Sequence, residues 1–146
     1  MLIYTPENKI EGGVDMENIE FRILKNIRCV HFMGTGDISF DYLISRIMDL
    51  HKDPDFDFSF NTFVDFEDAT VSLTVGGLEK YQSFFEGLQK ARIRRRWAIY
   101  SNNKMTLISA NVSHFLLAAE IKVDVFEIRE QALQYLGITD ADLDND

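Results

Sequence analysis

The sequence has one cysteine, two prolines and no long apolar run in its 146 residues. A single cysteine excludes an intrachain disulfide and any zinc site that takes two cysteines from one chain. Cys29 lies in an apolar, strand-like segment, which is typical of a small core residue. A membrane-spanning helix needs about 18 or more apolar residues, so we expect no membrane span. The first residues lack a basic region, so we expect no signal peptide and a cytoplasmic protein of bacterial type.

Basic residues are few. The chain has 15 Lys and Arg and 24 Asp and Glu, which gives a net charge of −9. Nucleic acids are bound by clustered Lys and Arg, so this charge argues against a nucleic-acid partner. A content of 46% hydrophobic and 27% charged residues is ordinary for a folded domain. We expect one domain over residues 19–138, an N-terminal extension over 1–18 and a frayed acidic tail over 139–146.

Two β-rich runs, Ile19–Leu24 and Ile27–Met33, open the predicted domain. The polar pair Lys25-Asn26 between them predicts a tight hairpin, because Asn tolerates left-handed backbone angles. The glycine-containing segment Gly34–Asp37 is expected to end the second strand.

After Ser39, a natural N-cap, apolar residues recur at helical spacing until Asp53-Pro54 stops the helix. Later segments alternate in the same way between strand and helix patterns. Strands are predicted at 60–66, 97–100 and 123–128, and helices at 78–91, 105–119 and 129–136, the last capped by Gly137. The order β-β-α-β-α-β-α-β-α predicts an α/β fold, with a mixed, mostly parallel five-stranded sheet and helices packed on it.

Five short segments follow one another in a characteristic order: Gly36–Phe40, Asp53–Phe56, Thr62–Phe66, Trp97–Ser101 and Val125–Gly137. Together they resemble the SpoIIAA-like branch of the STAS superfamily. The resemblance covers residues 19–138. It implies a small cytoplasmic α/β domain with a partly parallel sheet, of a kind that often has no assigned function.

The resemblance also raises the question of a phosphorylation switch. Phosphorylated STAS antagonists carry Asp-Ser-Ser/Thr-Gly where the third strand leads into the second helix. Here Gly77-Leu78 is similar to the end of that motif, but positions 74–76 lack its Asp and paired hydroxyls. Ser72 and Thr74 remain as nearby hydroxyls, and we expect neither to be an obligate switch.

Three acidic residues, Asp65, Glu67 and Asp68, lie where the third strand is predicted to end. Ligands of open α/β sheets bind beyond the carboxyl ends of strands, so the position suggests a phosphoryl acceptor or a magnesium or calcium site. A receiver domain would also need a second early acid and a late Lys. A phosphatase of the haloacid dehalogenase type would need Asp-x-Asp. Neither set is present, so we interpret Asp65 as a structural residue beside two solvated acids.

Two other patterns that often mark ligand sites are weak. The histidines His31, His51 and His114 lack zinc-binding spacing, so we expect no metal site. The pair Gly76-Gly77 precedes a predicted helix and could approach an anion with its backbone amides. A loop without a ligand explains one glycine pair more simply.

The basic residues concentrate in a single place, before the fourth predicted strand. The concentration consists of Lys90, Arg92, Arg94, Arg95 and Arg96. A solvated turn at a helix C-terminus explains them. The alternative is a patch for an acidic protein partner or for the acids of a second copy.

Aromatic residues are abundant, with 12 Phe, five Tyr and one Trp. The Phe-rich segment 56–66 and the apolar segment 105–121 offer more apolar surface than one small sheet needs. This surplus predicts a homodimer, or a cleft for a small apolar or lipid-like ligand. STAS-like sheets also resemble the lipid-binding CRAL-TRIO fold in outline.

These observations favour a non-enzymatic regulatory or protein-interaction domain without a cofactor. A binder of a small apolar or lipid-like ligand is the alternative. A metal-dependent enzyme that uses the Asp65 acid cluster is a weaker third hypothesis.

Overall fold

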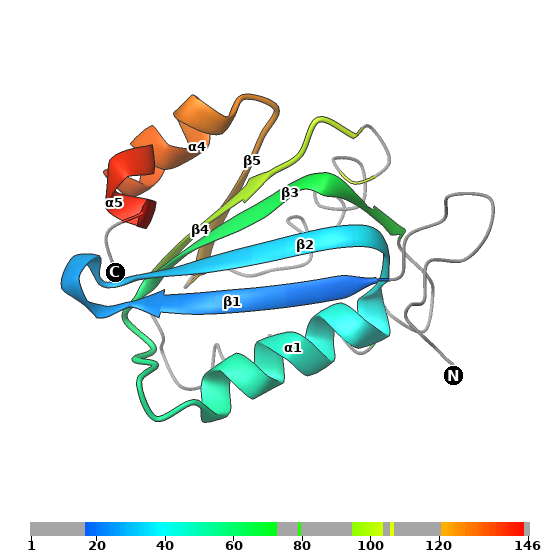
Figure 1. Cartoon of the computed structure of the whole chain (residues 1–146), viewed down its shortest axis with the longest axis horizontal. Helices are drawn as coiled ribbons and strands as arrows, with labels where there is room; N and C mark the ends of the chain where they lie inside the picture. Colours follow the sequence, from blue (N-terminus) through cyan, green and yellow to red (C-terminus); the bar gives the residue numbers. More distant parts are fainter. Residues whose placement is uncertain (1–16, 73–78, 80–94, 104–105, 107–120, 145–146) are drawn as a thin grey trace.

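A computed structural model of the chain describes residues 17–72, 79, 95–103, 106 and 121–144. Their five strands form one sheet in sequence order (Figure 1). The first two strands pair antiparallel, and every later pairing is parallel. The strands are β1 (Asn18–Leu24), β2 (Cys29–Ser39), β3 (Asn61–Ser72), β4 (Arg95–Tyr100) and β5 (Ile121–Phe126). The predicted mixed, mostly parallel sheet is confirmed. The helices predicted at 78–91 and 105–119 lie outside the described residues, apart from residues 79 and 106.

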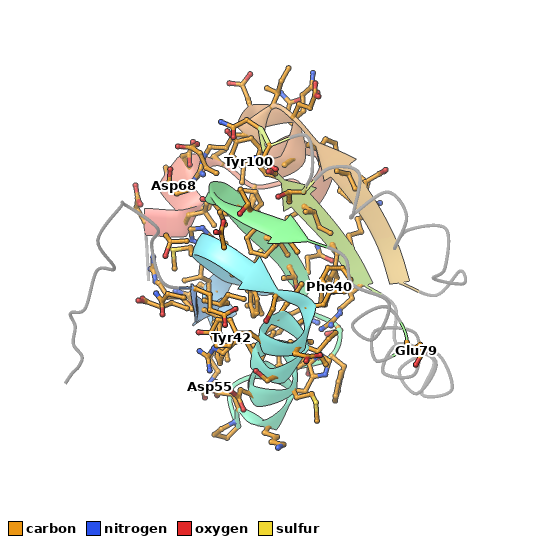
Figure 2. The ribbon with its side chains drawn as sticks, turned by 90° about the vertical axis from the view of Figure 1, so that its right-hand side faces the viewer. Phe40, Tyr42, Asp55, Asp68, Glu79 and Tyr100 are labelled. Atoms are coloured by element: carbon orange, nitrogen blue, oxygen red, sulfur yellow. The ribbon has the colours of Figure 1, made fainter. Side chains whose placement is uncertain are left out.

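Helices lie on both faces of the sheet. Helix α1 (Phe40–Lys52) covers one face, and α4 (Arg129–Leu136) and α5 (Asp140–Asp144) cover the other (Figure 1). Viewed along the sheet, Phe40 and Tyr42 lie on the α1 side and Tyr100 on the opposite side (Figure 2). No helix in the described part of the chain has the length and hydropathy needed to cross a membrane.

Helix α1 forms as its sequence predicts. The Ser39 side chain caps it by accepting a hydrogen bond from the Tyr42 backbone N–H at 3.2 Å. The helix ends at Lys52, directly before Asp53-Pro54. Its apolar stripe is buried against the sheet and consists of Phe40, Leu43, Ile44, Ile47 and Leu50.

Neighbouring residues of the central strands belong to two separate cores. Val64 and Trp97 pack in the core under α1, whereas Phe63 and Ala98 pack in the core under α4 and α5. This alternation follows from the two-residue period of a strand. It explains why successive residues of β3, from Thr62 to Val64, are all buried, because both faces of the strand are covered there.

The hairpin between β1 and β2 differs from the predicted two-residue turn. A 3-10 helix, Lys25–Ile27, connects the strands, and Arg28 takes the left-handed conformation with φ of 53°. Arg28 is the one non-glycine residue with positive φ in the described part of the chain. The prediction for Asn26 was therefore wrong by two positions.

The second and third strands run farther than predicted. The segment Gly34–Asp37 does not end β2, which continues to Ser39, and β3 continues beyond residue 66 to Ser72. The two strands stay paired across an irregularity, where the register moves from Met33 opposite Asp65 to Thr35 opposite Asp68. One residue of β2 thus faces two residues of β3, which is a β-bulge.

Gly34 occupies the β2 side of this bulge. A Cβ atom there would lie 2.6 Å from the ring of Phe66 and 2.7 Å from the Ile38 side chain. Both neighbours are buried, so the bulge requires a glycine at this position.

The predicted tail contains a helix, α5, over Asp140–Asp144, which corrects the expectation that this part of the segment 139–146 is frayed. Thr139 and Asp142 cap α5 reciprocally, each side chain accepting a hydrogen bond from the other's backbone N–H. Leu143 is only 2% exposed and anchors the helix in the core under α4. The sequence Thr139-x-x-Asp142 matches a capping box, which the acidic composition of the segment concealed.

We expect Gly34→Ala to lower the free energy of unfolding by about 1–3 kcal/mol, because the added methyl group overpacks the bulge. Thr35→Ala, at the next and exposed position, is the matched control and should change it by less than about 0.5 kcal/mol. Urea denaturation of the two variants measures the difference. Equal stability would contradict the role given to Gly34.

Candidate functional site

Asp65 lies in the interior of β3, and not at its end as the sequence predicted. Asp65 is nevertheless level with the carboxyl ends of the next two strands. It pairs with Tyr100, the last residue of β4, and Tyr100 pairs with Phe126, the last residue of β5. Its side chain is 16% exposed and shares the α4 face of the sheet with Phe63. The expected position of a site in an open α/β sheet is thus occupied by this carboxylate.

The Asp65 carboxylate is held by groups from three elements. Its Oδ2 atom accepts a hydrogen bond from Arg129 at the start of α4, at 2.6 Å. Its Oδ1 atom accepts one from the backbone N–H of Glu67 in the bulge, at 3.2 Å. The Nε2 atom of His31 in β2 lies 3.6 Å from Oδ2, beyond hydrogen-bond distance. The carboxylate therefore joins the sheet to α4.

These contacts set the protonation of Asp65. Burial by itself would raise the pKa of the carboxyl group. The neighbouring His31, the hydrogen bond and charge of Arg129, and the backbone N–H of Glu67 outweigh it and lower the pKa to about 2. Asp65 is consequently an anion throughout the neutral range.

The groups around Asp65 are also paired with one another. Arg129 bonds Asp140 of α5 through Nε at 3.1 Å and through its terminal nitrogen at 3.0 Å. The Tyr100 hydroxyl donates to Glu67 at 3.1 Å. Burial and the adjacent Glu67 carboxylate raise the pKa of Tyr100. These pairings engage Arg129, Glu67 and Tyr100, which are polar groups that a reaction at Asp65 would need.

His31 packs inside the same network. Its ring stacks on Phe63, with centroids 5.4 Å apart, and the side chain is 8% exposed. Neither ring nitrogen has a hydrogen-bond partner among the described residues. His31 was predicted to lie in a strand, but its approach to Asp65 across the β2–β3 pair had no signal in the sequence.

Several other predicted site residues fall in or beside segments that the structure leaves out. Thr74, Gly76, Gly77 and Arg94 lie outside the described residues, and Ser72 is described only as the last residue of β3. Within the described part of the chain, no group of three or more His, Cys, Asp or Glu is placed to hold a metal ion. Burial raises the pKa of the Cys29 thiol to about 12, so this cysteine is protonated and unreactive at neutral pH.

The two arginines that open β4 take opposite faces of the sheet. Arg96 points to the α4 side, where its terminal nitrogen donates to the Tyr135 carbonyl at 3.0 Å and its guanidinium lies over the Tyr135 ring. Its backbone N–H donates to Asn61 at 2.9 Å. Arg96 is thus engaged at the end of α4.

Arg95 points to the α1 side and is only 4% exposed. The sequence placed it in a solvated turn or on a surface patch for an acidic partner, and its burial corrects both. A side chain buried to this extent takes no part in a surface patch. Alternation along β4 explains the difference, because Arg95 and Trp97 are two residues apart and share one face.

The surroundings of Arg95 are aromatic. Its guanidinium carbon lies 4.7 Å from the Trp97 ring and 5.2 Å from the Phe56 ring, within the range of cation–π attraction. One terminal nitrogen lies 3.0 Å from His51 Nε2, at the end of α1. Burial and the charge of Arg95 lower the pKa of His51 to about 4, so the imidazole is neutral at pH 7.

Arg95 is therefore a buried cation without a carboxylate partner among the described residues. Its Nε and its other terminal nitrogen have no hydrogen-bond acceptor there. Burial lowers the pKa of Arg95 to about 9, which still leaves the guanidinium charged at neutral pH. A buried charge without a counter-charge is strongly unfavourable.

Comparison with known proteins identifies the fold. The chain is similar to the crystal structure of an uncharacterized protein of the DUF3478 family, with a SpoIIAA-like fold, from Shewanella loihica PV-4. The fold of this chain is SpoIIAA-like. The TM-score is 0.52 at 15% identity, and the match covers 84% of this chain and 96% of that one. The sequence matches no protein-family model and no curated protein.

We expect Asp65→Asn to lower the free energy of unfolding by about 1–3 kcal/mol at pH 7, because Arg129 loses a charged partner. The loss should depend on pH. A carboxyl whose pKa falls from 3.8 unfolded to about 2 folded stabilises fully above pH 3.8, and this contribution, about 2 kcal/mol, disappears as the pH falls through 2. Urea denaturation between pH 7 and pH 2 measures both effects.

The matched control is Asp55→Asn, which removes an exposed ion pair with Lys25 and should change stability by less than about 1 kcal/mol. A difference between wild type and Asp65→Asn that stays constant down to pH 2 would contradict the assigned network.

Proposed function

We propose that this chain is a non-enzymatic domain that acts by binding, as a regulatory or protein-interaction domain of SpoIIAA-like fold. One observation carries the proposal. At the carboxyl ends of the central strands, where a reaction would be expected, Asp65 is held by Arg129 and by the backbone of the bulge. Such a carboxylate holds the C-terminal helices to the sheet through its ion pair with Arg129.

The chemistry of Asp65 also supports a structural role. A general base works best when its pKa lies near the working pH, and a carboxylate with a pKa of about 2 is a weak base. A metal ion at Asp65 would have to displace Arg129, which already neutralises the carboxylate. Both arguments disfavour the weaker hypothesis of a metal-dependent enzyme at this cluster.

The proposal predicts that millimolar magnesium or calcium leaves the melting temperature of the protein unchanged, in the wild type and in Asp65→Asn alike. Differential scanning calorimetry with each ion and with EDTA measures this. Potassium chloride at matched ionic strength is the control for screening. A magnesium-dependent rise in melting temperature that disappears in Asp65→Asn would establish a metal site and overturn the proposal.

A second candidate function, the binding of a small apolar ligand, is favoured by the ring cluster at the end of α1. The His51 ring lies 5.1 Å from that of Phe56 and 4.9 Å from that of Phe58, between centroids. Phe58 is 42% exposed although it contacts two other rings. An exposed phenylalanine beside two half-buried rings is a surface that an apolar ligand can cover.

Self-association stays a prediction from the sequence. Phe60, Phe63 and Phe66 are buried within the chain, so they contribute nothing to a contact between copies. If a twofold contact forms by apolar burial, light scattering should give twice the 16.9 kDa of one chain, with little dependence on salt. A mass near 16.9 kDa at low and high salt would contradict the homodimer.

A further inference from the structure

The unpaired guanidinium of Arg95 needs an acceptor that the described residues do not supply. Its Nε carries one N–H bond and its unpaired terminal nitrogen carries two, and none of these reaches an acceptor in the described part of the chain. His51 supplies one nitrogen lone pair to the remaining terminal nitrogen. The Trp97 and Phe56 rings attract the cation but accept no ordinary hydrogen bond.

We propose that Arg95 binds the acidic end of a small apolar ligand, a monocarboxylate whose hydrocarbon or aromatic part lies against Phe56 and Phe58. The proposal rests on the second candidate function above and adds the chemical class of the ligand. It gives Arg95 an oxygen acceptor and a counter-charge at the same time.

The charge balance selects a monoanion. The site contributes one positive charge, because His51 is neutral at pH 7. Arg28 is exposed, donates to the Ser59 hydroxyl at 2.6 Å and lies over the Phe60 ring, so its charge is not counted with that of Arg95. A carboxylate cancels the single charge of Arg95 and offers two oxygens to its N–H groups. A phosphate dianion would leave one negative charge uncompensated among aromatic rings.

The aromatic rings favour a ligand whose part beyond the carboxylate is apolar. Phe56 contacts the Arg95 guanidinium, and its ring lies 5.2 Å from that of Phe58 in an edge-to-face arrangement. Phe58 is the exposed member of the group. A continuous series of contacts thus leads from the buried cation to an aromatic side chain at the surface, and a fatty or aromatic acid matches this succession.

The test compares decanoate with decanol, which has the same chain without the charge, and with inorganic phosphate. Trp97 is the only tryptophan of the chain and lies against Arg95, so its fluorescence reports on the site itself. Isothermal titration calorimetry gives the affinities independently. Decanoate should bind the wild type at least about tenfold more tightly than decanol does and change the Trp97 emission. Phosphate should bind more weakly than decanoate.

Variants at two adjacent positions locate the effect. Arg95→Gln should reduce the affinity for decanoate to that for decanol. Arg96→Gln, which alters the neighbouring arginine on the opposite face, should leave the affinity unchanged. Equal affinity of decanoate for Arg95→Gln and the wild type would overturn the assignment. If Arg95→Gln does not fold, the wild-type comparison of decanoate with decanol decides alone.

The outcomes separate the two proposals. If decanol binds the wild type as tightly as decanoate, the protein binds apolar ligands, but Arg95 does not bind their carboxylate. If neither compound binds, both proposals fail. If phosphate binds as tightly as decanoate, Arg95 binds anions in general, and the proposal of an apolar monocarboxylate is wrong.

Discussion

The ion pair between Asp65 and Arg129 determines how the C-terminal helices join the sheet. Arg129 begins α4, where a positive charge opposes the helix dipole, and Ile128 before it offers no side-chain cap. Asp65 on the sheet and Asp140 on α5 reverse this balance by bonding the guanidinium from two sides. One side chain thus connects β3, α4 and α5, and the bulge contributes its backbone N–H to the same carboxylate.

Arg95 of β4 and Arg129 of α4 are both largely withdrawn from solvent, but their charges are compensated in different ways. Arg129 has two carboxylate partners, and its N–H groups are distributed between them. Arg95 has aromatic rings and a neutral imidazole, which stabilise a cation less than a carboxylate does. On the α4 face the buried charges of Asp65 and Arg129 are therefore paired, whereas on the α1 face the charge of Arg95 has no counter-charge among the described residues. This asymmetry places binding, in our proposal, at the end of α1 and not at the acidic cluster.

Much of the fold could be predicted because it depends on local patterns. Helical spacing after Ser39 and the Gly137 cap both identify helices correctly, and Gly137 takes the left-handed conformation with φ of 73°. The sequence misled where tertiary contacts override local preference. Glycines normally weaken a strand, yet β2 passes through Gly34 because the Phe66 ring leaves room for nothing larger. The acidic composition of the tail likewise concealed a capping box and the anchoring of Leu143.

The candidate site was harder to predict, since a charge run gives no information about which side chains point inward. Arg94, Arg95 and Arg96 read as one basic patch, but strand alternation sends Arg95 and Arg96 to opposite faces of the sheet. Nothing in the sequence pairs His51 with Arg95 across 44 positions.

The buried charge of Arg95 bears on the function of the domain. Apolar residues of similar volume often replace buried charges without loss of stability, and sometimes with a gain. The rings of Trp97 and Phe56 present apolar surface, which an apolar side chain can also contact, so the aromatic surroundings do not by themselves require a guanidinium. A group that costs stability in the protein alone is explained when it interacts favourably with a ligand that the protein binds. On this reasoning the unpaired N–H groups of Arg95 belong to the binding chemistry of the domain, whereas the saturated carboxylate of Asp65 belongs to its architecture.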